Sequence, residues 1–160
     1  MIAVAVLGLA GCGGSAPKGA SENASRLLAA AVRGDRVAFE AEIDRDAVRA
    51  DLRRQMAEMA RAKALDVDGG PSEFALDRMI GPDALRLVRA GSGEVLTAAP
   101  TLGQVAQMMT RLDNRRACLR ADPASAPGDD RCPLTFAKLK GGWRLVGMQA
   151  TDLKIEVAGD

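Results

Sequence analysis

The sequence contains no histidine and no tyrosine, and its only aromatic residues are three phenylalanines and one tryptophan. Without histidine, the chain cannot form a histidine-containing catalytic triad or a histidine-ligated zinc site. Oxyanion holes that depend on a tyrosine hydroxyl are excluded as well, and so few aromatic rings cannot make a base-stacking platform for single-stranded nucleic acid. These absences exclude several common enzyme and binding sites.

The sequence also has no large excess of one charge, because it contains 22 lysines and arginines and 21 aspartates and glutamates, for a formal net charge of +1. Proteins that bind nucleic acid need a concentrated excess of positive charge, so nucleic acid is not an expected partner. Carboxylates alone could still bind a metal ion, but no segment has the spacing of a calcium-binding loop. We therefore expect neither a metal nor a cofactor.

Residues 1–11 carry no charge and are rich in aliphatic side chains. A helix over these residues would fall well short of the roughly 20 residues that are needed to span a bilayer. A short apolar segment that ends in small residues is typical of an export signal instead. The alternative is a buried N-terminal strand or helix.

The end of this segment, Leu9-Ala10-Gly11-Cys12, resembles the lipobox of bacterial lipoproteins, where a signal peptidase cuts before a cysteine that carries lipid. The resemblance implies a signal peptide over 1–11, a lipidated Cys12 and a flexible Gly- and Ser-containing spacer over 12–20. Two or three acyl chains would make the anchor durable. Because Gly13 is not an aspartate, the resemblance favours the outer membrane, with the protein facing the periplasm.

Residues 21–160 have the length of a single domain. Helical spacing predicts a helix from Ser21 or Asn23 to Arg33, a short helical turn after Asp35, and the longest helix over 44–65. Further helices are expected after Ser72 and from Pro82. The longest helix has an apolar stripe on one side and a charged stripe on the opposite side. We interpret the charged stripe as solvated, although a protein interface would look the same. The apolar stripe is Val48, Leu52, Met56 and Met59.

Towards the C-terminus, apolar and polar residues alternate along the chain instead of recurring at helical spacing. Residues 105–112 fit either a helix or a strand, and strands are expected over 117–120, 133–140 and 143–149, with Gly141-Gly142 as a hairpin turn. Residues 153–157 alternate and would add an edge strand. The predicted fold class is therefore α+β, with N-terminal helices packed on a C-terminal antiparallel sheet.

Cys118 and Cys132 flank a loop rich in Pro, Gly and Asp. In an oxidising periplasm they are well placed for a disulfide that links the two strands of a hairpin, worth about 3 kcal/mol. A redox-active pair is the alternative, but neither cysteine lies in a Cys-x-x-Cys turn or at a predicted helix N-terminus. With Cys12 lipidated, the pairing accounts for every cysteine.

Three stretches resemble an uncharacterised bacterial envelope family, domain of unknown function 2939. They are Arg33-Gly34-Asp35 with the apolar positions that follow it to Gln55-Met56, Gly81-Pro82-Asp83 with Leu85, and the strand and turn from Phe136 to Val146. The family has no agreed activity, so the resemblance implies an envelope location and no catalytic residue. The order of elements is also similar to the nuclear-transport-factor-2-like cone, which can enclose a pocket.

These observations favour a membrane-anchored, non-catalytic binding or envelope-assembly module, with an envelope protein as its partner. One alternative is a small-molecule or lipid carrier whose pocket is lined by Met108, Met109, Phe136 and Trp143, side chains that could equally pack the core. The other is an isomerase or hydrolase of the cone fold. In that case a buried Asp77 or Asp113 with a raised pKa would act as the general base.

Overall fold

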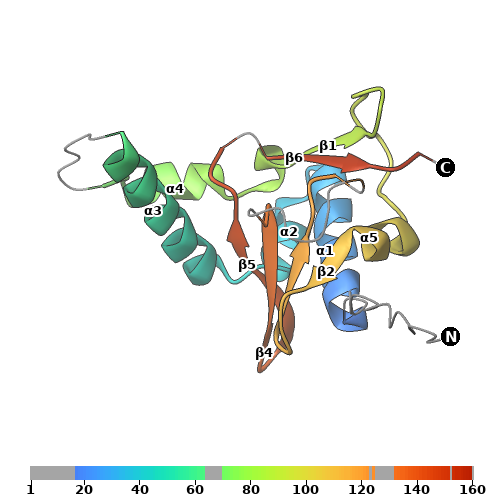
Figure 1. Ribbon diagram of the computed structural model, residues 1–160, viewed down its shortest axis with the longest axis horizontal. Helices are drawn as coiled ribbons and strands as arrows, with labels where there is room; N and C mark the ends of the chain where they lie inside the picture. The colour runs from blue at the N-terminus through green and yellow to red at the C-terminus, as the bar shows by residue number, and fades with distance from the viewer. Residues whose placement is uncertain (1–16, 64–69, 123, 125–131, 152, 160) are drawn as a thin grey trace, which may run out of the picture.

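The computed structural model describes residues 17–63, 70–122, 124, 132–151 and 153–159. Its elements run from the N-terminal helices to the C-terminal strands (Figure 1). The helices are α1 (Lys18–Arg33), α2 (Arg36–Ala41), α3 (Arg45–Ala62), α4 (Glu73–Met79), the 3-10 turn η1 (Pro82–Ala84) and α5 (Leu102–Met108). The strands are β1 (Arg86–Arg89), β2 (Met109–Arg111), β3 (Arg116–Leu119), β4 (Leu134–Leu139), β5 (Gly142–Met148) and β6 (Lys154–Val157).

The main sheet is antiparallel and has the strand order β2-β3-β4-β5. Helix α1 packs on β4 and β5, while α3 packs along β5. The Cys118–Cys132 disulfide joins β3 to the residues that lead into β4, with the two Cα atoms 5.5 Å apart. The α+β class, the packing of N-terminal helices on an antiparallel sheet and the disulfide-linked hairpin are all confirmed.

The outer side of β5 is covered by the segment between α2 and α3. Ile43 forms a parallel bridge with Leu145. The backbone N–H of Leu145 donates to the carbonyl of Glu42 at 3.0 Å, and the N–H of Asp44 donates to the carbonyl of Leu145 at 2.8 Å. This segment therefore satisfies backbone groups that an edge strand would leave open.

A second, two-stranded sheet pairs β1 with β6 in parallel, with Leu87 opposite Ile155 and Val88 opposite Glu156. The predicted strand over 153–157 is present, but it joins β1 and not the main sheet. The helix predicted from Pro82 is wrong beyond Ala84, because Leu85, Leu87 and Val88 continue into the extended chain of β1. Pairing with a distant strand overrides the local helical spacing.

The helix ends agree well with the predicted capping residues. The side chains of Asp35, Asp44 and Ser72 accept hydrogen bonds from the third residue of α2, α3 and α4. Gly34 adopts φ 65°, the left-handed conformation that ends α1. Thr101 caps α5 and forms a capping box with Gln104, a feature that the sequence analysis does not predict.

The predicted start of α1 is wrong. The helix begins at Lys18, so residues 18–20 of the predicted spacer are helical, and Ala20 is fully buried. Ser21 and Asn23 do not cap the helix, since both are buried within it. The amide of Asn23 donates to the carboxylate of Glu42, so burial against the rest of the fold decides where the helix begins.

Residues 105–112 divide between the two predicted alternatives, because α5 ends at Met108 and β2 begins at Met109. The hairpin turn between β4 and β5 consists of Lys140 and Gly141, one residue earlier than predicted, since Leu139 pairs with Gly142. No helix in the described ranges is long and apolar enough to cross a membrane.

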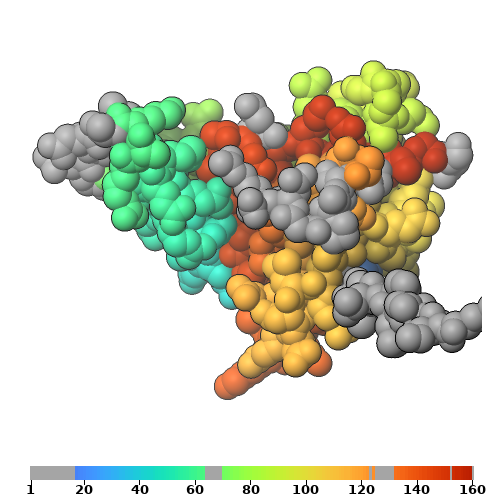
Figure 2. Space-filling model, viewed as in Figure 1, coloured from blue at the N-terminus to red at the C-terminus, as the bar shows by residue number. Residues whose placement is uncertain are grey.

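The apolar stripe of α3 enters the core only in its first half. Val48 and Leu52 are fully buried, Met56 is half-buried, and Met59 is 37 % exposed. Val37 of α2 and Phe74 of α4 are also exposed, at 83 % and 71 %. The C-terminal half of α3 therefore extends beyond the core and, together with α4, forms a lobe at one side of the molecule (Figure 2).

Gln55 attaches α3 to the end of β5. Its side-chain amide donates to the carbonyl of Met148 at 2.8 Å and accepts from the backbone N–H of Ala150 at 3.1 Å. The same amide donates to Asp51 at 2.7 Å. Gly147 makes this approach possible, since a Cβ atom at that position would lie 2.9 Å from an Asp51 carboxylate oxygen.

Replacing Gln55 with alanine should lower the free energy of unfolding by about 1–3 kcal/mol, because two backbone groups at and just after the end of β5 lose this partner. Glu58→Ala, an exposed position on the same helix, should change it by less than about 0.5 kcal/mol. Urea denaturation measures both values. Equal effects of the two substitutions would contradict this role for Gln55.

Candidate functional site

The residues predicted to line a carrier pocket lie mostly in the core. Phe136, Met108 and Met109 are 0 %, 1 % and 6 % exposed and belong to the same apolar cluster, against which the half-buried Trp143 packs. Neither of the two hollows described here is lined by any of them. The predicted lipidation site, Cys12, lies outside the described residues.

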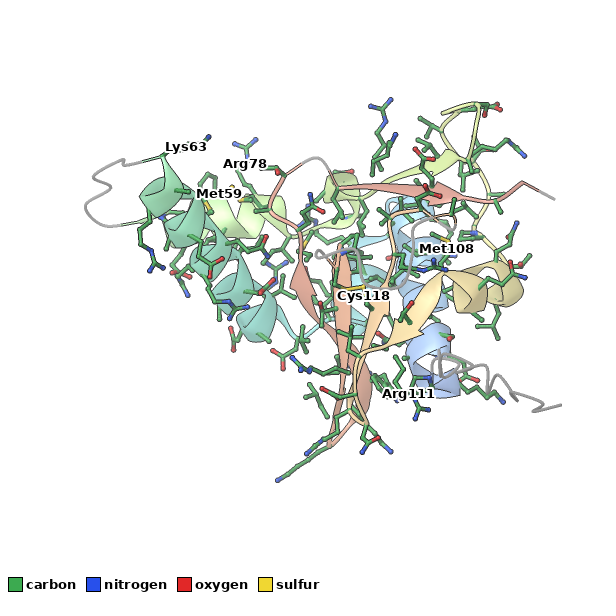
Figure 3. All side chains as sticks on the ribbon, viewed as in Figure 1. Met59, Lys63, Arg78, Met108, Arg111 and Cys118 are labelled. Carbon is green, nitrogen blue, oxygen red and sulfur yellow. A yellow bond between two sulfur atoms is a disulfide. The ribbon has the colours of Figure 1, made fainter. Side chains whose placement is uncertain are left out.

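The larger hollow, which we call the α3 groove, lies beside the C-terminal half of α3 and has a volume of about 910 Å³. Its other walls come from the residues that lead into α4 and from the segment after β5. Figure 3 shows Met59 and Lys63 at this end of α3, with Arg78 nearby on α4. The described lining consists of Arg53, Met56, Ala57, Met59, Ala60, Arg61, Lys63, Gly70, Pro71 and Thr151.

The α3 groove combines an apolar floor with a basic rim. Methionine, alanine and proline supply most of the floor, and flexible methionine side chains adapt to apolar partners of different shapes. The rim carries Arg53, Arg61 and Lys63, and no acidic side chain is among the described residues that line the groove. Arg53 also makes an ion pair with Glu73 of α4. The groove therefore suits an apolar segment with negative charge.

An ionic cluster holds α4 beside α3. The Asp77 carboxylate accepts from Arg45 Nη1 at 2.8 Å and from Arg49 Nε at 2.7 Å, and Arg49 Nη2 lies 2.6 Å away. Arg45 also pairs with Glu40 of α2. Three helices are thus joined through two arginines, and the cluster fixes the position of α4 relative to the groove.

The environments of Asp77 and Asp113 contradict the general-base prediction. Hydrogen bonds from Arg49 and Arg45 lower the pKa of Asp77 below its usual 3.8. Hydrogen bonds from the Arg116 side chain and the Arg115 backbone lower the pKa of Asp113 in the same way. Neither carboxyl is buried in an apolar pocket that would raise its pKa, so neither is suited to take a proton near neutral pH.

The smaller hollow, of about 430 Å³, lies between the start of α3 and the β4–β5 turn. Its charged side chains include Asp44, Arg45, Asp46 and Arg144. Asp44 caps α3, and Arg45 is bound by Glu40 and Asp77. Elsewhere too, over the ranges that the structure describes, no group of three or more cysteines and carboxylates is placed to hold a metal ion.

The sequence pattern places Met56 and Met59 on the same apolar stripe as Val48 and Leu52, so it does not reveal the groove. A signal was present, because the apolar stripe of α3 changes from Val48 and Leu52 to methionines and is followed by Arg61 and Lys63. The sequence did not reveal where the main sheet ends. The structure places that end near the middle of the helix, where Gln55 meets Met148 and Ala150.

The Asp77 carboxylate should stabilise the fold most above pH 4 to 5, since its folded pKa lies below the unfolded value of about 3.8. This contribution should fade as the pH falls through the folded pKa. Asp77→Asn should therefore be less stable than wild type at neutral pH, and the difference should shrink in acid. Unfolding by urea at several pH values measures it.

Asp46→Asn is the matched control for this experiment. The Asp46 side chain is 94 % exposed, and Arg49, at 3.5 Å, is its one ion-pair partner among the described residues. The substitution should change stability little at any pH. A stability difference between wild type and Asp77→Asn that stays constant from neutral pH into acid would contradict the proposed linkage.

Searches of protein-family models, of curated proteins and of solved structures find no match to this chain.

Proposed function

We propose that this chain is a bacterial envelope lipoprotein that is anchored through Cys12 and faces the periplasm. The single observation that best supports this proposal is the Cys118–Cys132 disulfide. Structural disulfides persist in oxidising compartments outside the cytoplasm. The lipobox at 9–12 predicts the same compartment from an unrelated part of the sequence. Outer-membrane location and membership of the envelope family described above belong to this proposal.

The folded part of the chain acts, in this proposal, as a non-catalytic binding or assembly module. The α3 groove is its binding surface, and the occupant is an apolar segment of an envelope protein that carries acidic side chains. In this proposal the methionine floor contacts the apolar side chains of that segment, and Arg61 and Lys63 pair with its acidic side chains. Binding of this kind needs no reacting group, which fits the ion-paired state of Asp77 and Asp113.

The carrier alternative would have to use the same groove. Phe136, Met108 and Met109 are packed in the core, so a lipid or small molecule would have to displace them to bind where the sequence suggested. The basic rim favours an acidic polypeptide segment or an anionic amphiphile over a neutral ligand. The experiment on the groove described below separates these occupants.

Intact-mass analysis of the full-length protein from membrane fractions tests the anchor. Wild type should carry a lipid-sized mass increase that disappears in Cys12→Ser. Both forms should lack two hydrogens because of the Cys118–Cys132 bond. An unmodified N-terminus with all three cysteines as free thiols would overturn the envelope proposal.

A photo-reactive amino acid at Ala57, in the groove, should cross-link to an envelope polypeptide in cells that produce the protein. The cross-linked peptide should be apolar with acidic residues, and Arg61→Glu with Lys63→Glu should reduce the yield severalfold. Val37, on α2 and 83 % exposed, is the matched control position. Lipid adducts at Ala57 would support the carrier instead, and equal yields from both positions would contradict a specific groove.

A further inference from the structure

Basic side chains gather at one end of the main sheet, which we call the hairpin end. It consists of the β2–β3 turn, the β4–β5 turn and the first turn of α1. Figure 3 places Arg111 there, and Figure 2 shows the two turns as the lower projection of the molecule. Its basic residues are Lys18, Arg111, Arg115, Arg116, Lys138, Lys140 and Arg144.

The strand pairing brings these residues together. The backbone N–H of Lys138 donates to the Arg115 carbonyl at 2.8 Å, and Arg115 Nη2 donates to the Lys138 carbonyl at 3.3 Å. The two turns therefore lie side by side. The start of α1 lies against the first residues of β5, since a Cβ atom on Gly19 would be 2.7 Å from Trp143 Cδ1.

Few acids neutralise this end. Asp113 pairs with Arg116 at 2.6 Å, and Glu22 lies 3.7 Å from Lys18. Asp44 and Asp46 border it on the α3 side, in the smaller hollow. Within the described part of the chain, no carboxylate forms an ion pair with the remaining basic residues, which are Arg111, Arg115, Lys138, Lys140 and Arg144.

Two leucines stand exposed among these charges. Leu112, next to β2, is 48 % exposed, and Leu139, at the end of β4, is 37 % exposed. Side chains that combine positive charge with exposed apolar groups are typical of surfaces that bind anionic lipid. The charges attract the headgroups, and the leucines can enter the boundary below them.

The anchor would reach the membrane from the same end. An extended chain from Cys12 to Pro17 spans at most roughly 20 Å, and α1 begins directly after Pro17. A lipidated Cys12 would therefore hold the first turn of α1, and the hairpin turns beside it, close to the bilayer. This step rests on the proposed function.

We propose that the hairpin end binds the surface of an anionic phospholipid membrane and orients the domain on it. Helix α3 begins next to the β4–β5 turn and is roughly 27 Å long for its 18 residues. Its C-terminal end lies away from the hairpin turns (Figure 1). In this orientation the α3 groove points away from the lipid and is open to a partner.

The test uses the full chain with Cys12→Ser, so that no acyl chain contributes. It should sediment with vesicles of phosphatidylcholine and phosphatidylglycerol and much less with phosphatidylcholine alone, and added salt should weaken the binding. Reversing three exposed charges, Arg111→Glu, Lys138→Glu and Lys140→Glu, should reduce binding to anionic vesicles more than tenfold, since each basic residue near such a surface contributes about fivefold.

The matched control reverses three exposed charges elsewhere, Arg33→Glu, Arg86→Glu and Lys154→Glu, and should retain most of the binding. An equal loss in the control, or equal binding to neutral and anionic vesicles, would overturn the proposal. If the triple variant does not fold by circular dichroism, Lys140→Glu alone, in the exposed turn, should still weaken binding severalfold. Unchanged binding by that folded variant would also overturn it.

Failure of the lipid anchor and failure of the hairpin end are distinguishable. The intact-mass experiment reports only on Cys12, whereas the vesicle experiment is carried out without that cysteine. An unmodified chain that still binds anionic vesicles would remove the proposed anchor and leave the hairpin end as a lipid-binding surface. If the chain is lipidated but its Cys12→Ser variant does not bind anionic vesicles, the anchor stands and the hairpin end is not a lipid-binding surface.

Discussion

The architecture depends on how the outer side of β5 is covered. The backbone of Leu145 donates to Glu42 and accepts from Asp44 along this outer edge, and Asp44 then caps α3. The segment that completes the sheet therefore also sets the position at which the longest helix begins. Gln55 holds the same helix to the end of β5, so α3 is attached to the strand at two points. Its remaining turns extend beyond the core.

This extension explains why the α3 groove exists. A helix that continues past the sheet has no strand left to cover its apolar stripe, so Met56 and Met59 face a hollow. The arginines of α3 then serve a structural purpose, since Arg45 and Arg49 bind Asp77 and keep α4 alongside. The sequence suggests that the charged stripe of α3 is solvated, but the stripe also takes part in the connection between helices. The free-energy cost of this pairing is small, because the side chains remain partly exposed.

The two ends of α3 differ in what surrounds them. Its first turn lies beside the β4–β5 turn, which belongs to the basic hairpin end. Its last turns form the groove. A chain with almost no net charge can thus present a concentrated positive surface, because pairing of strands gathers residues that are widely separated in the sequence. The proposed membrane surface and partner surface lie at opposite ends of one rigid element.

Local features were determined by the sequence alone. Asp35, Asp44 and Ser72 cap helices because a short side-chain oxygen reaches the free N–H groups of the first turn, and Gly34 ends α1 because it tolerates a positive φ. Alternation predicted β4 and β5, and the two cysteines around one loop predicted the disulfide. Tertiary structure decided the rest: the change from helix to strand after Ala84, the partner of β6, the early start of α1 and the partial exposure of the groove methionines. Each of these depends on contacts between distant segments, whose free energy outweighs the small local preferences that a sequence pattern reveals.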